Sequence, residues 1–251
     1  MSAVTFDCTG ERVLVTGAAG LIGRALVRRF ADAGADVLAV DVDADGLKVF
    51  DGVPRVAAMP GDLAREDVAD AVFARLVQDG GLDVLVNNAA MTEVRTPFID
   101  IDAGVWDAVV AANLRSAYLL SVRAVRHWRD AGRGGVIVSM SSPGGSRAHD
   151  DQSAYDVTKA GIEALSRAIA VELGGLGIRA NCIAPASVVG DVRPATDIPS
   201  GRTTSPEEVA DAALYLASPA AAQLNGHVLR LDGGLHARLR TDPSQEQQRE
   251  P

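Results

Sequence analysis

Tyr155 and Lys159 are the residues of this chain whose types and spacing most directly suggest chemistry. They lie four positions apart at the start of a predicted helix, so their side chains share one face. A free tyrosine has a pKa of about 10, too high for a base at neutral pH, but a nearby ammonium stabilises the phenolate and lowers that pKa. Such a pair could exchange a proton with the oxygen of an alcohol or ketone. Ser142 lies thirteen residues before Tyr155, at the carboxyl end of a predicted strand, where open α/β sheets bind their ligands.

The segment Thr16–Gly23 places glycines at 17, 20 and 23 between a predicted strand and a predicted helix. Glycines at this spacing let the backbone turn sharply and approach a pyrophosphate, and the helix N-terminus that follows offers free N–H groups. A glycine string alone also occurs in ordinary structural turns. The strand before it and the helix after it favour a phosphate cradle.

Asp41 ends the next predicted strand, eighteen residues after Gly23. This is about the offset at which an acidic side chain accepts hydrogen bonds from an adenosine ribose. A solvated turn carboxylate is the alternative, because Asp43 and Asp45 follow. Ribose binding by Asp41 would favour NAD over NADP, since a 2′-phosphate about 4 Å from a carboxylate is repelled by roughly 1 to 4 kcal/mol.

Short apolar runs alternate along the chain with segments of helical spacing. Strands are predicted at residues 12–16, 36–41, 55–59, 82–87, 135–140, 178–183 and 228–231. Helices are predicted at 21–33, 66–78, 105–130 and 153–173, and a further helix begins at 205–208 with a capping box. This alternation predicts an α/β fold: a Rossmann-like, doubly wound parallel sheet with helices on both faces. We expect one domain over residues 1–240 and a disordered polar tail at 241–251.

The composition excludes several classes of protein. Of the 251 residues, 47% are hydrophobic and 23% charged, which excludes disorder for most of the chain. The net charge of −9 argues against a nucleic-acid surface. Cys8 and Cys182 form neither a disulfide framework nor a metal-ligand pattern, so we expect reduced thiols and no metal site. No secretory signal and no apolar stretch long enough for a bilayer is apparent, so we expect a cytoplasmic protein without a membrane partner.

Together these features resemble the short single-domain branch of the short-chain dehydrogenase/reductase family, over roughly residues 10 to 236. The resemblance rests on Thr16-Gly17…Gly23, Asp62-Leu63, Asn87-Asn88-Ala89-Ala90, Asn113, Ser142, Tyr155…Lys159, Asn181-Cys182-Ile183-Ala184-Pro185, Pro206-Glu207-Glu208-Val209 and Leu231-Asp232-Gly233-Gly234.

The resemblance implies four catalytic roles. Tyr155 would be the general acid/base, and Ser142 would hydrogen-bond the substrate oxygen. Lys159 would bind the nicotinamide ribose and lower the pKa of the tyrosine, and Asn113 would hold a water in the proton relay. Ser141 is the alternative candidate for the serine that bonds the substrate oxygen, although the alignment of residues 135–142 favours Ser142.

The resemblance also implies a set of residues that line the cofactor NAD. Asp62 would reach the adenine, and Asn87 with Ala89 would line the cofactor. The full set is Gly17, Gly20, Leu21, Ile22, Gly23, Asp41, Asp62, Leu63, Asn87, Ala89, Tyr155, Lys159, Pro185 and Val188.

The implied activity is an NAD-dependent oxidoreductase that interconverts a small-molecule secondary alcohol and a ketone. A cofactor-binding regulatory or scaffold protein of the same fold is the alternative. The helices at 105–130 and 153–173 carry small and apolar residues over more than one face. This pattern, like the resemblance, predicts a homodimer or homotetramer, a thick monomer core being the alternative.

The chain departs from the family pattern at several positions. Leu21 replaces the middle glycine of the turn, Ala90 and Ala186 replace glycines, and Gly190 replaces a threonine. Only residues 191–200 stand where relatives have a longer lid, which predicts an open pocket or one closed by a partner subunit or the C-terminal tail. Arg95 and His149 could recognise an anionic or polyhydroxyl substrate, or could be ordinary surface residues. The candidate pocket residues are Met91, Thr92, Arg95, Pro143, Gly144, His149, Gln152, Ala186 and Ser187.

Overall fold

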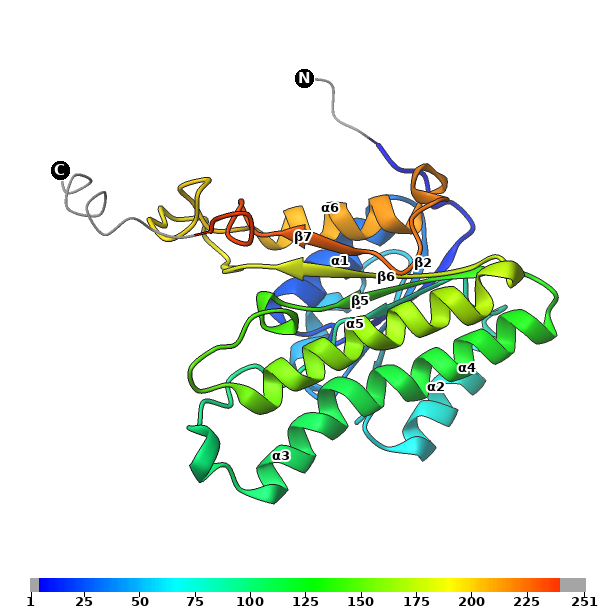
Figure 1. Cartoon of the computed structure of the whole chain (residues 1–251). Helices are drawn as coiled ribbons and strands as arrows, with labels where there is room; N and C mark the ends of the chain where they lie inside the picture. Colours follow the sequence, from blue (N-terminus) through cyan, green and yellow to red (C-terminus); the bar gives the residue numbers. More distant parts are fainter. Residues whose placement is uncertain (1–4, 240–251) are drawn as a thin grey trace.

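Seven strands form one parallel sheet in the computed structural model, which describes residues 5–239 (Figure 1). The strand order is β3-β2-β1-β4-β5-β6-β7. The strands are β1 (Arg12–Thr16), β2 (Asp36–Asp41), β3 (Val56–Pro60), β4 (Val84–Asn87), β5 (Gly135–Met140), β6 (Ile178–Pro185) and β7 (Val228–Leu231). The predicted doubly wound, Rossmann-like sheet of a single domain is confirmed.

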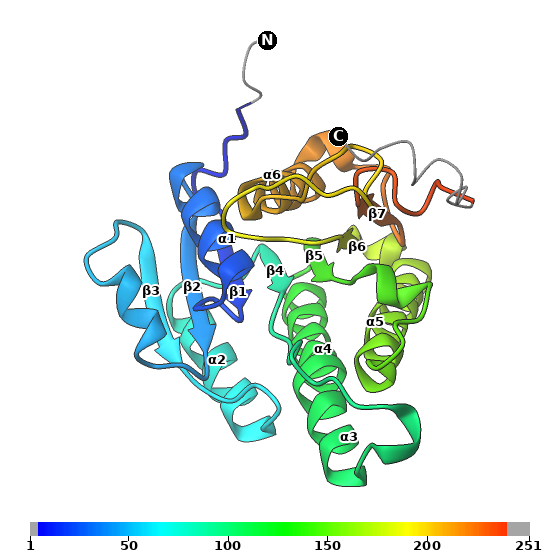
Figure 2. The same cartoon turned by 90° about the vertical axis from the view of Figure 1, so that its left-hand side faces the viewer.

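Helices cover both faces of this sheet (Figure 2). One face packs against α1 (Leu21–Asp32) and α6 (Pro206–Ala217), and the other against α2 (Glu66–Gln78), α4 (Ser116–Asp130) and α5 (Ser153–Leu173). Side chains of a strand alternate between faces, so Val13 and Val15 enter the first hydrophobic cluster while Leu14 enters the second. Strands that feed two cores need apolar residues at nearly every position, as their sequences show.

The chain reverses its direction of winding between β1 and β4. Strand β1 pairs with β2 on one side and with β4 on the other, and all these pairs are parallel. The connections that leave β1 and β4 therefore diverge from each other at the carboxyl edge of the sheet. Such a switch point opens a crevice in which doubly wound folds bind their ligands.

The predicted helix at 105–130 is two helices separated by a π turn. Helix α3 (Ala103–Val110) begins two residues earlier than predicted, where Asp102 caps it by accepting a hydrogen bond from the Gly104 N–H at 2.7 Å. The π turn follows at Ala111–Arg115 and contains Asn113, and α4 continues from Ser116. An extra residue in one turn is not visible in a pattern of apolar spacing.

The other differences from the predicted boundaries are small. Strand β6 runs two residues further than expected, β4 starts two residues later, β3 is shifted by one residue, and α1 ends one residue earlier. The capping box of α6 is confirmed: Ser205 Oγ accepts from the Glu208 N–H at 3.2 Å, and Glu208 Oε2 accepts from the Ser205 N–H at 2.9 Å. Cys8 and Cys182 are buried free thiols. The expected tail at 241–251 lies outside the described residues.

One helical segment, Ala103–Asp130, is long and apolar enough to span a bilayer by length and composition, contrary to the expectation from the sequence. Leu119, Leu120, Ala124 and Trp128 of this segment are buried in the hydrophobic cluster on the sheet. The core helices of globular domains meet the same criterion, because helices that pack on a sheet are also long and rich in apolar residues.

Candidate active site

A cavity of about 970 Å³ lies at the carboxyl edge of the sheet, around the switch point. Its lining begins where strands end: Gly17 follows β1, Asp41 ends β2, Asn88 follows β4, Ser141 follows β5 and Pro185 ends β6. Among the predicted site residues, the cavity brings together Gly17, Gly20, Leu21, Ile22, Gly23, Asp41, Asp62, Leu63, Ala89, Ser142, Tyr155, Lys159, Pro185 and Val188.

The glycine turn is packed too tightly for side chains at two of its positions. Gly17 has φ +62°, and a Cβ there would lie 2.7 Å from Ala89 Cα. A Cβ on Gly23 would collide with the carbonyl oxygen of Gly17. The N-terminus of α1 has no side-chain cap at Gly20, so its first N–H groups remain available to an anion in the cavity.

Asp41 is held at the edge of this turn by two backbone groups. Its Oδ2 accepts from the Ala19 N–H at 2.9 Å, and its Oδ1 accepts from the Asp43 N–H at 3.0 Å. Carboxylate oxygens have further lone pairs, so Asp41 can accept more hydrogen bonds from a ligand. Asp62 also lines this end of the cavity.

Lys159 and Tyr155 lie next to each other in the N-terminal part of α5. Lys159 is buried, its Nζ donates to the Met140 carbonyl at 2.8 Å, and the same Nζ lies 5.3 Å from the Tyr155 ring centroid. Burial lowers the pKa of Lys159 to about 8. Burial raises the pKa of Tyr155, and the hydrogen bond with Ser142 acts in the opposite direction. The Lys159 ammonium donates to a backbone carbonyl here, and its role in lowering the pKa of the tyrosine stays a prediction.

Ser142 and Ser141 both line the cavity, but their hydroxyls have different partners. Ser142 Oγ accepts from the Gly144 N–H at 3.2 Å and bonds to Tyr155. Ser141 Oγ donates to Oε1 of the buried Glu163 at 2.6 Å. The geometry therefore favours Ser142 as the partner of a substrate oxygen.

Two predicted site residues lie outside the cavity lining. Asn113 is buried in the π turn, where Oδ1 accepts from the Met91 N–H at 2.6 Å and Nδ2 donates to the Met91 carbonyl and to Thr158 Oγ1, both at 3.2 Å. Its side chain holds the segment after β4 in place. Asn87 is buried beneath the site, and its Nδ2 donates to Ser121 Oγ and Ser139 Oγ. The expectation that Asn87 lines the cavity is not met: the residues that line it there are Asn88, Ala89 and Ala90.

The short lid is attached to the chain's own C-terminal segment. The Ser200 N–H donates to the Gly233 carbonyl at 2.9 Å, and Ile198 is buried in the lid. Asp197 of the lid and Leu235 of the C-terminal segment both line the cavity. The C-terminal tail at 241–251, one of the closing elements considered from the sequence, lies outside the described residues, and the segment that contacts the lid precedes it.

A set of polar contacts that the sequence did not suggest holds this C-terminal segment in place. His236 Nδ1 lies 2.9 Å from Asp232 Oδ2, its Nε2 lies 2.8 Å from Ser146 Oγ, and Arg147 donates to the Leu235 carbonyl at 3.2 Å. We call these contacts the C-terminal clasp. The hydrogen bonds link a serine to a histidine and the histidine to an aspartate, as in the catalytic triad of a hydrolase. The N–H groups of Ser146 and Arg147 both donate to the Pro143 carbonyl, so neither remains to stabilise an oxyanion.

Known proteins resemble this chain over most of its length. The family model described as enoyl-(acyl carrier protein) reductase matches residues 17–236. D-threitol dehydrogenase of Mycolicibacterium smegmatis is 36% identical over 91% of this chain and 94% of its own. Cis-4-hydroxycyclohexanecarboxylate dehydrogenase of Sinomonas cyclohexanicum is 38% identical over 92% of this chain and 99% of its own.

Solved structures share the fold as well. The 3-ketoacyl-(acyl-carrier-protein) reductase of Brucella melitensis, crystallised with NADH, superposes with a TM-score of 0.84 at 29% identity, over 91% of this chain and 99% of that chain. The motifs, the fold and these matches agree: the chain belongs to the short-chain dehydrogenase/reductase family of oxidoreductases.

Proposed function

We propose that the protein is an NAD-dependent oxidoreductase that interconverts a secondary alcohol and a ketone. The convergence of Tyr155, Ser142 and Lys159 on one cavity that also holds the glycine turn and Asp41 carries this proposal. The names of the two dehydrogenases and the NADH bound to the Brucella reductase support it.

The residues of the cavity fit a nicotinamide dinucleotide. The crowding around Gly17 and Gly23 leaves backbone rather than side chains at the turn, and the uncapped N–H groups of α1 suit a pyrophosphate. Asp41 would accept from the adenosine ribose and Lys159 would donate to the nicotinamide ribose, with Val188 beside the nicotinamide ring. The bound dinucleotide would supply the hydride acceptor or donor.

The choice of NAD over NADP follows from the charges at the adenosine end. Asp41, Asp43 and Asp62 line this end of the cavity, whereas the basic side chains among its described lining residues are Lys159 and His149, beside Tyr155. A 2′-phosphate next to Asp41 would meet carboxylates, and the described residues that line this end include no lysine or arginine to neutralise it.

The proton is handled by this chain's own side chains. Ser142 would orient the substrate oxygen, and Tyr155 Oη would give its proton to a ketone or take one from an alcohol. Because burial raises the pKa of Tyr155, the phenol is protonated at neutral pH and suited to donate to a ketone. For alcohol oxidation, positive charge next to the phenol has to lower that pKa.

The Tyr155→Phe variant tests the proposal. NADH formation from a panel of secondary alcohols should fall by at least about 100-fold, with little change in thermal midpoint because only a hydroxyl is lost. Ser142→Ala should lower turnover far more than Ser141→Ala, whose main effect should be on stability, since it leaves Glu163 without its hydroxyl partner. Normal turnover in Tyr155→Phe would move the proton transfer to another group. NADH binding without turnover of any alcohol by the wild type would indicate the scaffold alternative.

A further inference from the structure

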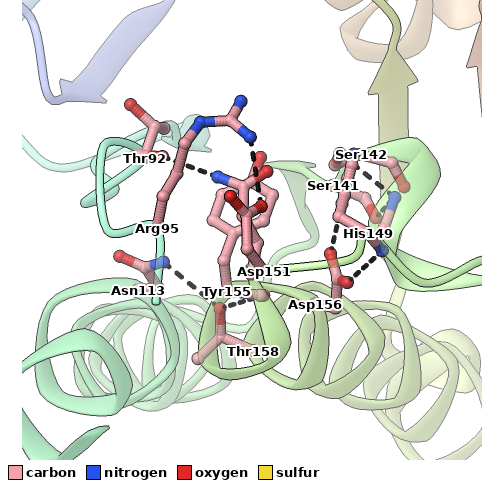
Figure 3. A network of polar contacts seen from close by, with 12 residues as sticks. Thr92, Arg95, Asn113, Ser141, Ser142, His149, Asp151, Tyr155, Asp156 and Thr158 are labelled. Carbon is pink, nitrogen blue, oxygen red and sulfur yellow. Dashed lines mark hydrogen bonds and ion pairs between the residues drawn. The ribbon is translucent and has the colours of Figure 1, made fainter. Parts of the chain in front are cut away.

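Two loops that contact each other border the cavity near Tyr155 and Ser142, one at residues 91–97 and the other at 146–152. The Thr96 N–H donates to the Asp151 carbonyl at 2.7 Å, and Gln152 Nε2 donates to the Thr92 carbonyl at 3.0 Å. Arg95 lies 3.2 Å from Asp151 Oδ1, so its charge is paired with this carboxylate (Figure 3). Thr92 and His149, one from each loop, line the cavity.

His149 is held in one orientation by Asp156. Its Nδ1 lies 2.7 Å from Asp156 Oδ1, and its backbone N–H donates to Asp156 Oδ2 at 2.8 Å. The Asp156 side chain is only 10% exposed, and a Cβ on Gly144 would collide with its Oδ1. This carboxylate binds the Nδ1–H of the imidazole and leaves Nε2 as the ring nitrogen available to a ligand.

The imidazole stands beside the proposed proton donor. The His149 and Tyr155 rings meet edge to face with centroids 6.4 Å apart, and the His149 side chain is 39% exposed. In Figure 3, His149 and Asp156 lie together with Ser142 on one side of Tyr155. A substrate whose reacting oxygen bonds to Ser142 and Tyr155 therefore brings the neighbouring part of its skeleton close to His149.

The charges of the cavity lining disfavour an anion on the substrate. Glu93 and Asp197 line the cavity, and the basic side chains among the described lining residues are Lys159 and His149, which is paired with the Asp156 carboxylate. A carboxylate or phosphate on the substrate would meet these two carboxylates, and no arginine is among the described lining residues. A hydroxyl can both donate to and accept from an imidazole without this penalty.

We propose that His149 is a substrate-binding residue and that the substrate is a neutral polyol, an alcohol with a second hydroxyl near the reacting carbon. This inference rests on the proposed alcohol–ketone chemistry and names its substrate class. The hydroxyl that reacts lies between Ser142 and Tyr155, and the second one bonds to His149 Nε2. Asp156 is a positioning residue, since it acts through the imidazole.

Matched neutral and anionic compounds test the charge argument. Sorbitol and gluconate differ by one carboxylate, as do erythritol and erythronate. With NAD, kcat/KM should be at least about tenfold higher for the polyol of each pair, the factor expected from about 1.4 kcal/mol of repulsion. Equal or better use of the carboxylates would overturn the inference, while oxidation of cyclohexanol would leave the proposed function standing.

Variants of His149 test the contact itself. His149→Ala should raise KM for the polyol about tenfold, the cost of one hydrogen bond to a buried ligand, and should raise KM for cyclohexanol far less. His149→Gln, which keeps a hydrogen-bonding side chain, should restore part of the loss, and His227→Ala removes an exposed histidine as the control. An equal rise for cyclohexanol would show that His149 only holds its loop, and would overturn the inference.

A binding measurement keeps the test independent of turnover. Calorimetric titration of sorbitol and gluconate into protein saturated with NADH should show binding of sorbitol that is weakened in His149→Ala. Such binding without turnover of any alcohol would support the inference while it removes the proposed function. No binding of sorbitol would overturn the inference.

Discussion

Asp41 is the residue through which cofactor choice can be measured. Removal of its carboxylate in Asp41→Ala removes the repulsion of a 2′-phosphate and the acceptors for the ribose hydroxyls. We expect the ratio of the Kd of NADPH to that of NADH to fall by about tenfold, measured by fluorescence titration. Asp45→Ala is the control, because this exposed carboxylate pairs with Lys48 outside the cavity. A wild type that binds NADPH as tightly as NADH would contradict the NAD assignment.

Lys159 is expected to lower stability while it supports activity. Burial lowers its pKa to about 8 in the folded chain, against an ordinary value of 10.5 for a lysine in water, so the unfolded chain binds more protons between these values. The free energy of unfolding therefore rises with pH between about 8 and about 10.5, because the penalty of burying the charge disappears as Lys159 loses its proton. At pH 7 the full penalty is present.

Lys159→Met should therefore unfold at a higher temperature than the wild type at pH 7. The expected gain is roughly 2 kcal/mol, after the lost hydrogen bond to Met140 is subtracted from the burial penalty, and activity should be lost. The difference in thermal midpoint should shrink as pH approaches 10. Lys48→Met alters the other lysine of the chain, which is exposed, and should change neither property. A variant less stable than the wild type at pH 7 would contradict this prediction, because it would show that the contacts of the buried ammonium fully offset the penalty of burying its charge.

At the scale of elements, the C-terminal clasp holds the part of the cavity wall that lies next to the short lid. Leu235 lines the cavity only as long as the segment from Asp232 to Arg238 stays in place, and His236 joins that segment to Ser146. His236→Ala should raise KM for the alcohol several-fold and leave the Kd of NADH unchanged, because the contacts of His236 are to Ser146 and Asp232 and not to the glycine turn, Asp41 or Lys159. Faster amide hydrogen exchange at residues 232–238 should accompany it.

The outcome that would contradict the role of the clasp is a change in NADH affinity with an unchanged KM for the alcohol. His227→Ala serves again as the control, since His227 is exposed and lies outside the cavity lining.

At the scale of the whole molecule, α5 presents an uncovered apolar stripe. Val157, Ala160, Ala164, Ala168 and Val171 are exposed along it, at spacings of three and four residues. Small side chains at this spacing permit close approach of a second helix, and two-fold symmetry makes the stripe complementary to itself. We propose that this stripe forms the interface of a homodimer or homotetramer.

Ala168→Glu should dissociate that assembly and leave the subunit folded, because Ala168 is exposed rather than packed on the sheet. Light scattering at micromolar concentration should give a multiple of 26.0 kDa for the wild type and about 26.0 kDa for the variant. Ala74→Glu, on the exposed side of α2, is the matched control and should change nothing. A wild-type mass of one subunit would contradict the proposal.

Most of the secondary structure could be predicted because its determinants are local. Strand β1, helix α2, helix α5 and the capping box of α6 have the predicted bounds, since apolar spacing and caps act within a few residues. The π turn at Ala111–Arg115 could not be predicted in this way. Asn113 in that turn bonds to Met91 and Thr158, which are distant in sequence.

The sequence by itself determined the glycine turn, the acidic end of β2, the serine after β5 and the Tyr-x-x-x-Lys face of α5, because each is a short segment whose backbone and spacing suffice. Only the tertiary structure decided what surrounds them. It buried Lys159 against Met140, placed Asn87 beneath the cavity, and raised the pKa of Tyr155. It also brought His236 to Ser146 across ninety residues of sequence. Burial and pairing between distant segments depend on how the layers pack, and a local pattern carries no information about that packing.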